Sequence, residues 1–130
     1  MERDEQLVAM RPALPSARVT TNMSEEELFQ NITLRPIVKL QNDLLVAAFK
    51  NYIVQRKNVF HNLKADQRSK YIEHSVNRDQ RFKNLLKGMI VGCFTQDEYA
   101  TYMENSTALN KRIMNLIRER LMSNILLFAE

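Results

Sequence analysis

Five polar side chains interrupt the apolar surfaces of two predicted helices, and their types could bind a small ligand. At about 100° per residue, each falls within the arc that faces the core; these residues are Gln41, Asn42, Asn110, Arg120 and Asn124. An unpaired buried polar group costs roughly 1–3 kcal/mol, so these groups need hydrogen-bond partners. We expect the two helices to share a polar layer, with Arg120 paired to a carboxylate. Such a layer fixes the register of a bundle, which we favour, or lines a binding pocket.

A basic stretch in the middle of the chain is the second candidate for chemistry. Residues 50–87 hold ten Lys and Arg against three acids, a net charge of +7, whereas the whole chain carries +4. Such a surface attracts nucleic acid or an acidic partner, although a solvated helix face is the commoner explanation. If one unbroken helix follows residue 64, four of these cations lie within about 120° of one another. The candidate contacts are Lys57, Lys64, Arg68, Arg78 and Arg81.

Residues for metal or enzymatic chemistry are sparse. His61 and His74 lie thirteen residues apart without a Cys pair, whereas zinc and iron sites need three or four ligands of defined geometry. Cys93 falls on an apolar stripe and is typical of a small buried side chain. Gly88 and Gly92, the two glycines of the chain, form neither a phosphate-binding loop nor a nucleophile elbow. We therefore expect no metal, no cofactor and no enzymatic activity.

Long helices must position these side chains. The 130 residues include two Gly and three Pro, too few for the turns of a sheet protein, and the Gly-free runs favour helix. Residues 33–57 are predicted to form a central helix, with Thr33 as its N-cap and Pro36 in its first turn. Its apolar residues cover roughly 240° of the surface, so we place it at the centre of a bundle. Arg35 precedes a proline, so we expect a bend there.

Four further helical segments follow from capping signals and apolar spacing. Short helices are predicted at about 25–31 and 96–104, each beginning with a capping box. A second long helical region covers about 65–92. It is either one unbroken helix or two helices, the second of which begins with Asp79 as its N-cap. The last helix is predicted at about 107–128. Its apolar positions recur at helical spacing to the end of the chain.

These elements predict an all-α fold. We expect a compact bundle of four to six helices, with two or three long helices packed roughly antiparallel around residues 37–53. Residues 23–130 form a single domain. Residues 1–22 carry mixed charge and two prolines without a sustained period, so we expect a loosely ordered N-terminal arm. The single cysteine, and the absence of a signal sequence or a long apolar run, favour a cytoplasmic protein that does not contact membranes.

The C-terminal residues suggest self-association. The sequence Ile-Leu-Leu-Phe at 125–128 is apolar on more than one side of the last predicted helix. A second copy of the chain would cover such a surface. We therefore expect a homo-oligomer, with a dimer favoured, and Leu126 and Phe128 as its candidate contacts.

Several segments also resemble a known group of proteins. The segments QNITLRPIVKLQNDLL, FKNYI, YIEHS, DQRFKNLLKGMIVG, FTQDEY and STALNKRIMN span residues 30–115. They resemble small all-helical bacterial proteins of unassigned role, some of which carry the label glyoxalase. The resemblance implies one compact unit and transfers no catalytic residue. Glyoxalase-type folds are similar to paired βαβββ modules that hold a metal with His and Glu ligands. This chain lacks strand patterns and such a ligand set, so we do not adopt that activity.

Three functional hypotheses remain. The favoured one is a non-enzymatic helical interaction module, self-associating and binding an unidentified protein partner, with a basic face at residues 56–87. The second is a nucleic-acid-binding protein that contacts phosphates through the same face. The least favoured is a small-ligand binder or enzyme that uses the polar layer between the central and C-terminal helices.

Overall fold

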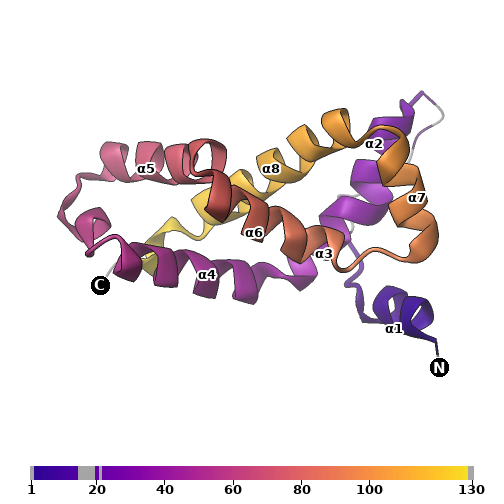
Figure 1. Ribbon diagram of the computed structural model, residues 1–130, viewed down its shortest axis with the longest axis horizontal. Helices are drawn as coiled ribbons and strands as arrows, with labels where there is room; N and C mark the ends of the chain where they lie inside the picture. Colours follow the sequence, from indigo (N-terminus) through magenta and orange to yellow (C-terminus); the bar gives the residue numbers. More distant parts are fainter. Residues whose placement is uncertain (1, 15–19, 21, 129–130) are drawn as a thin grey trace.

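The computed structural model describes residues 2–14, 20 and 22–128 of the chain. It confirms the all-α class, because every regular element in these ranges is a helix (Figure 1). The α-helices are α1 (Arg3–Met10), α2 (Glu25–Phe29), α3 (Arg35–Leu40), α4 (Asn42–Gln55), α5 (Ala65–Arg78), α6 (Gln80–Val91), α7 (Gln96–Glu104) and α8 (Ser106–Ser123). A π-helix, η1 (Gln30–Leu34), and two 3₁₀ helices, η2 (Val59–Asn62) and η3 (Ile125–Phe128), complete the set. These helices are more numerous and shorter than the sequence predicted.

The longer helices pack along one another in an elongated molecule. The chain passes through α3 and α4 toward one end, turns at η2, and returns through α5 and α6 (Figure 1). The last long helix, α8, then runs in the same direction as α4 and packs against α3, α4, α5 and α6. The predicted antiparallel arrangement therefore holds for α4 and α5 but not for α4 and α8. No helix in the described part of the chain is long and apolar enough to cross a membrane.

The predicted central helix is interrupted in two places. Thr33 is not an N-cap, because it lies within η1, which continues α2 directly. Arg35 is helical (φ −60°, ψ −46°) although it precedes Pro36, and its N–H bonds to the carbonyl of Gln30, five residues back. The proline ring would crowd the carbonyl four residues before it, and the wider π turn relieves that contact. The second interruption is a bend at Gln41, which separates α3 from α4.

Three helix starts follow their local sequence signals. The Ser24 side chain accepts a hydrogen bond from the backbone N–H of Glu27 at 3.2 Å. The capping box of α7 is complete: Thr95 Oγ1 accepts from the Glu98 N–H at 3.1 Å, and Glu98 accepts from the Thr95 N–H at 2.9 Å. Asp79 divides the predicted 65–92 region, because its side chain caps α6. The predicted capping box of α7 is thus confirmed, and the question left open at Asp79 is resolved as a break.

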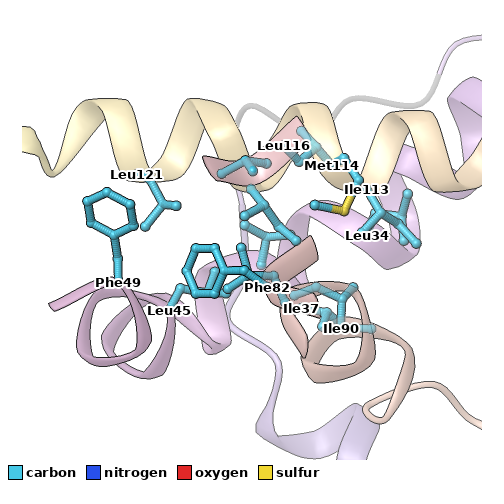
Figure 2. Close-up of a cluster of buried hydrophobic side chains, with 14 of the residues drawn as sticks. Leu34, Ile37, Leu45, Phe49, Phe82, Ile90, Ile113, Met114, Leu116 and Leu121 are labelled. Carbon is cyan, nitrogen blue, oxygen red and sulfur yellow. The ribbon is translucent and has the colours of Figure 1, made fainter. Parts of the chain in front are cut away.

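The hydrophobic core lies beneath α8. Leu121 and Ile113 of α8 point toward apolar side chains of α3, α4 and α6 (Figure 2). Phe49 of α4 is wholly buried and is the centre of an aromatic cluster. Its ring centroid lies 5.8 Å from that of Phe60 in η2 and 6.1 Å from that of Phe82 in α6. This cluster fixes the turn at η2, and with it the relative positions of α4 and α5.

Phe128 belongs to the same cluster, so its predicted role in self-association was wrong. It is 2% exposed, and its ring centroid lies 4.7 Å from that of Phe49. The chain leaves the helix at Ser123 and forms η3, which turns Phe128 inward. Leu126 points the other way and is 85% exposed. The apolar C-terminal sequence therefore divides between the core and the surface.

The N-terminal segment differs from the loosely ordered arm that we expected. Residues 3–10 form α1, which buries no side chain and is held by polar contacts instead. Arg3 donates to the backbone carbonyls of residues 92 and 94 at 2.9 Å each, and Asp4 accepts from the N–H of residue 96. Arg11 contacts Glu98. Apolar periodicity cannot reveal such docking, because charged side chains provide it. Residues 1, 15–19 and 21 of the expected arm lie outside the described residues.

Candidate anion-binding groove

The five predicted polar-layer residues do not form one layer. Asn124 donates to Asn42 Oδ1 at 2.8 Å, the one direct bond among the five in the described residues. Gln41 donates to a backbone carbonyl of α6 at 2.9 Å, and Asn110 accepts from a tyrosine hydroxyl of α7 at 2.5 Å. No carboxylate of the described residues pairs with Arg120. These bonds join different pairs of helices at separate places. Among the five predicted residues, only Asn124, which directly follows α8, forms a hydrogen bond to a residue of α4.

The five predicted basic contacts are also divided. Lys57 and Arg78 line one groove, whereas Lys64 precedes α5 as an exposed residue outside it. Arg81 belongs to α6, so it does not continue the face of α5 as the unbroken-helix argument required. Arg68 is half-buried; it donates to two backbone carbonyls at 3.0 and 3.1 Å and lies 5.1 Å from an aromatic ring centroid. Arg68 therefore holds the turn at η2.

The groove that contains Lys57 and Arg78 lies between the C-terminal end of α4, η2 and the second half of α5. Its volume is about 640 Å³. Arg56, Lys57 and Arg78 contribute three positive charges to its walls, and Asp79 contributes the one carboxylate. Val59 adds an exposed apolar side chain. We call this site the basic groove.

Asp79 leaves most of the positive charge of the basic groove uncompensated. Its carboxylate caps α6, accepts a hydrogen bond from the Tyr52 hydroxyl at 2.9 Å and forms an ion pair with Arg56. The N–H of Phe82 first, and then the Tyr52 hydroxyl, hold the pKa of Asp79 below its usual value. The carboxylate is therefore ionised near neutral pH, and its interactions are with Phe82, Tyr52 and Arg56 of the protein itself. The charges of Lys57 and Arg78 remain available to a ligand.

Arg56 was not among the predicted contacts, although a local signal could have found it. It follows Tyr52 by four residues, a spacing that places two side chains on the same helix face. The guanidinium of Arg56 lies 4.9 Å from the Tyr52 ring centroid. The carboxylate that joins Arg56 and Tyr52 comes from Asp79, and no sequence pattern predicts that contact.

Lys57 adopts a backbone conformation that usually belongs to glycine. The helix α4 ends in a Schellman motif, in which Asn58 N–H bonds to Ile53 O at 3.0 Å and Lys57 N–H bonds to Val54 O at 3.1 Å. Lys57 occupies the C′ position with φ 61°, and Asn58 follows with φ 59°. The left-handed region costs an ordinary residue roughly 1–2 kcal/mol. A lysine at this position places a charged side chain beside the groove at the expense of stability.

The rings of the two tyrosines in the basic groove, Tyr52 and Tyr71, pack against aromatic side chains of the core. The ring centroids of Tyr52 and Phe82 lie 4.1 Å apart in a stacked arrangement, and Arg56 lies over the Tyr52 ring. Tyr71 meets Phe60 edge to face at 5.4 Å. The Tyr71 hydroxyl is buried and has no hydrogen-bond partner among the described residues. Burial raises the pKa of both tyrosines. Neither ring offers a free face on which a nucleic-acid base could stack.

The described residues show neither a group of metal ligands nor a reactive thiol. Within the described ranges, no three His, Cys, Asp or Glu side chains are grouped as metal ligands would be. Burial raises the pKa of the Cys93 thiol, which accepts a hydrogen bond from Gln41 at 3.3 Å. The thiol is thus held as a neutral, partly buried group, which is the inert form of cysteine.

Comparisons with protein-family models, with curated proteins and with solved structures found no match to this chain. The resemblance to small helical bacterial proteins therefore stays a prediction, and the function has to be argued from the geometry of the basic groove.

Proposed function

We propose that this protein is a non-enzymatic interaction module that binds an acidic segment of a protein partner in the basic groove. Lys57 and Arg78 attract the carboxylates of that segment, and Val59 contacts an apolar side chain between them. Electrostatic attraction of this kind speeds association and selects against basic partners.

The observation that carries this proposal is the left-handed backbone of Lys57. Glycine at the C′ position would end α4 without steric cost, and the structure instead has a long cationic side chain there. A residue in such a conformation is a reason to look for a function that requires its side chain. The location of Lys57 near Arg78 supports such a function, because these two cations, which have no carboxylate partner among the described residues, line one concave surface.

The groove favours a protein ligand over a nucleic acid. Single-stranded nucleic acid is usually held by aromatic rings on which the bases stack, combined with cations that contact the phosphates. In the basic groove the rings of Tyr52 and Tyr71 pack against other aromatic side chains. An extended acidic peptide needs cations and a small apolar contact, both of which are present. Nucleic-acid binding is the alternative that the experiment must separate.

The test is fluorescence anisotropy with a labelled Glu-rich peptide and with labelled single- and double-stranded oligonucleotides. We expect the peptide to bind at low salt and to weaken as salt rises. Lys57→Gly should weaken peptide binding about five-fold, because an exposed ion pair contributes up to about 1 kcal/mol. The same substitution should stabilise the fold by about 1 kcal/mol, because glycine removes the left-handed strain. Opposite effects on binding and on stability distinguish a binding residue from a structural one.

Lys64→Gln is the matched control, because it removes one exposed charge outside the groove. If it weakens binding as much as Lys57→Gly does, binding depends on net charge and the groove has no special role. Binding of the oligonucleotides alone, with a salt slope that implies several phosphate contacts, would replace the proposal with the nucleic-acid alternative. Absence of binding to every probe at low salt would overturn both.

A further inference from the structure

The charges of this protein are separated along its length. One end is built from α1, α2, η1 and α7, and the other from η2, α5 and the C-terminal end of α4 (Figure 1). At the first end, ranges 2–14, 22–34 and 94–106 hold nine acids against two arginines, a net charge of −7. At the second end, residues 50–79 hold seven cations against three acids, a net charge of +4. Arg35, Lys111 and Arg112 also lie at the first end, where they line a pocket with Gln30 of η1, and they reduce its net charge to −4. The net charges of the two ends are therefore opposite in sign.

The acidic end carries a groove of its own. It lies between α2, η1 and α7 and has a volume of about 460 Å³. Leu28 and Ile32 form apolar walls and are 37% and 51% exposed. The exposed carboxylates of Glu25, Asp97 and Glu104 surround them. We call this site the acidic groove.

The basic end has the complementary chemistry. Val54 and Val59 are 62% and 47% exposed at the C-terminal end of α4 and in η2. Val59 lines the basic groove together with the exposed cations Arg56, Lys57 and Arg78, of which Arg56 is paired with Asp79. The two unpaired cations are opposite in sign to the carboxylates of the acidic groove. Exposed apolar side chains within a charged rim are typical of protein-binding surfaces. Both ends therefore expose apolar side chains, and the charges beside them are opposite in sign.

We infer that a second copy of this chain docks head to tail, with its basic end seated on the acidic groove of the first copy. Val59 of one copy then contacts Leu28 and Ile32 of the next, and the charged side chains around these residues pair with one another. The contact is heterologous, so it continues from copy to copy into an open chain or a ring. This inference rests on the proposed function, because it identifies the acidic segment bound by the basic groove as part of the same protein.

The test uses two charge-reversed variants and sedimentation velocity. Lys57→Glu with Arg78→Glu reverses the basic end, and Glu25→Lys with Glu104→Lys reverses the acidic end. The wild-type protein should sediment faster as its concentration rises at about 0.05 M salt, and as a monomer at about 0.5 M salt. Each variant alone should remain a monomer. An equimolar mixture should associate again, because the two intact ends pair with each other and the two reversed ends are also opposite in sign.

Several outcomes would overturn the inference. A wild-type protein that stays monomeric at low salt contradicts it, as does a mixture of variants that does not associate. Self-association lost on Leu126→Ser but retained in both charge variants would place the interface at the exposed C-terminal leucine instead. Circular dichroism must show native helix content in each variant, and the single substitution Glu104→Lys replaces the acidic double variant if that one unfolds. Lys57-dependent binding of a Glu-rich peptide by a monomeric wild type would retain the proposed function and reject the head-to-tail contact.

Discussion

The guanidinium of Arg11 and the carboxylate of Glu98 form two hydrogen bonds, at 2.6 and 2.7 Å, across 87 residues of sequence. Their side chains are 9% and 17% exposed. Glu98 also accepts bonds from the Thr95 N–H at 2.9 Å and from the Thr33 hydroxyl at 3.2 Å. One carboxylate thus joins the N-terminal segment, η1 and the start of α7.

Glu98→Gln should therefore destabilise the fold. The amide can still accept one bond from Thr95, but it cannot pair with the charge of Arg11, which remains partly buried. We expect a loss of about 2 kcal/mol in the free energy of unfolding, measured by urea denaturation, because hydrogen bonds to charged groups contribute about that much. Asp97→Asn, which removes an exposed charge from the same helix, should change stability by at most about 0.5 kcal/mol. A cost near zero for Glu98→Gln would mean that desolvation offsets the ion pair.

The stability of the protein should fall in acid because of Asp79 and Glu98. The N–H of Phe82 lowers the pKa of Asp79; burial opposes ionisation of Glu98, but its bonds from Arg11 and Thr95 outweigh burial and lower its pKa as well. The unfolded chain therefore binds protons at a higher pH than the folded protein. This contribution is fully present above about pH 5 and is lost as the pH falls through the folded pKa values.

Asp79→Asn tests that dependence, because asparagine caps a helix without titrating. We expect this variant to be less stable than the wild type near neutral pH and to lose less stability on acidification. Urea midpoints at about pH 6 and about pH 3 provide the measurement. An unchanged difference between the two pH values would show that Asp79 contributes nothing to the acid response.

Phe128→Ala and Leu126→Ala should differ sharply although the two residues are neighbours in the C-terminal sequence. Phe128 is 2% exposed and contacts Phe49, so its truncation should cost about 3–5 kcal/mol. Leu126 is 85% exposed, so its truncation should change stability by at most about 0.5 kcal/mol. Thermal or urea denaturation at fixed protein concentration compares them. Similar costs would indicate that an interface covers Leu126.

Removing the hydroxyl groups of Tyr52 and Tyr71 should have different effects. Tyr52→Phe loses the bond to Asp79 and should cost about 1 kcal/mol. Tyr71→Phe removes a buried hydroxyl that has no partner among the described residues, so stability should stay the same or rise by up to about 1 kcal/mol. Urea denaturation of both variants decides between these expectations. Destabilisation of Tyr71→Phe equal to that of Tyr52→Phe would reveal a bound water or another partner of the Tyr71 hydroxyl.

The helices were largely predictable because their ends depend on nearby residues. Ser24, Thr95 and Asp79 each cap a helix by accepting the N–H of the third residue after them. The π turn at η1, which joins α2 to α3 without a break, was not predicted. Local rules placed a boundary at Arg35 and Pro36, but the chain continued as a π turn in which Arg35 stays helical. Packing of Leu34 and Ile37 in the core favours that continuation over a break.

The candidate site was predicted only in part because exposure depends on residues far away in sequence. Arg68 belongs to the same basic stretch as Lys57 and Arg78, yet it donates to backbone carbonyls that precede α5. Arg56 pairs with Asp79, 23 residues later. Counting cations along the chain cannot separate those that hold a turn from those that remain free.

The sequence by itself determined the all-helical class, the helix starts at Ser24, Asp79 and Thr95, and the uneven distribution of charge. Those features arise from interactions within about four residues, or from composition alone. The tertiary structure decided which side of the C-terminal segment is buried, how α1 docks, and which cations converge on a groove. Phe128 faces Phe49 because the chain leaves α8 at Ser123, and Lys57 faces the groove because α4 ends in a left-handed turn. Contacts between distant segments fix these choices, and no local pattern encodes them.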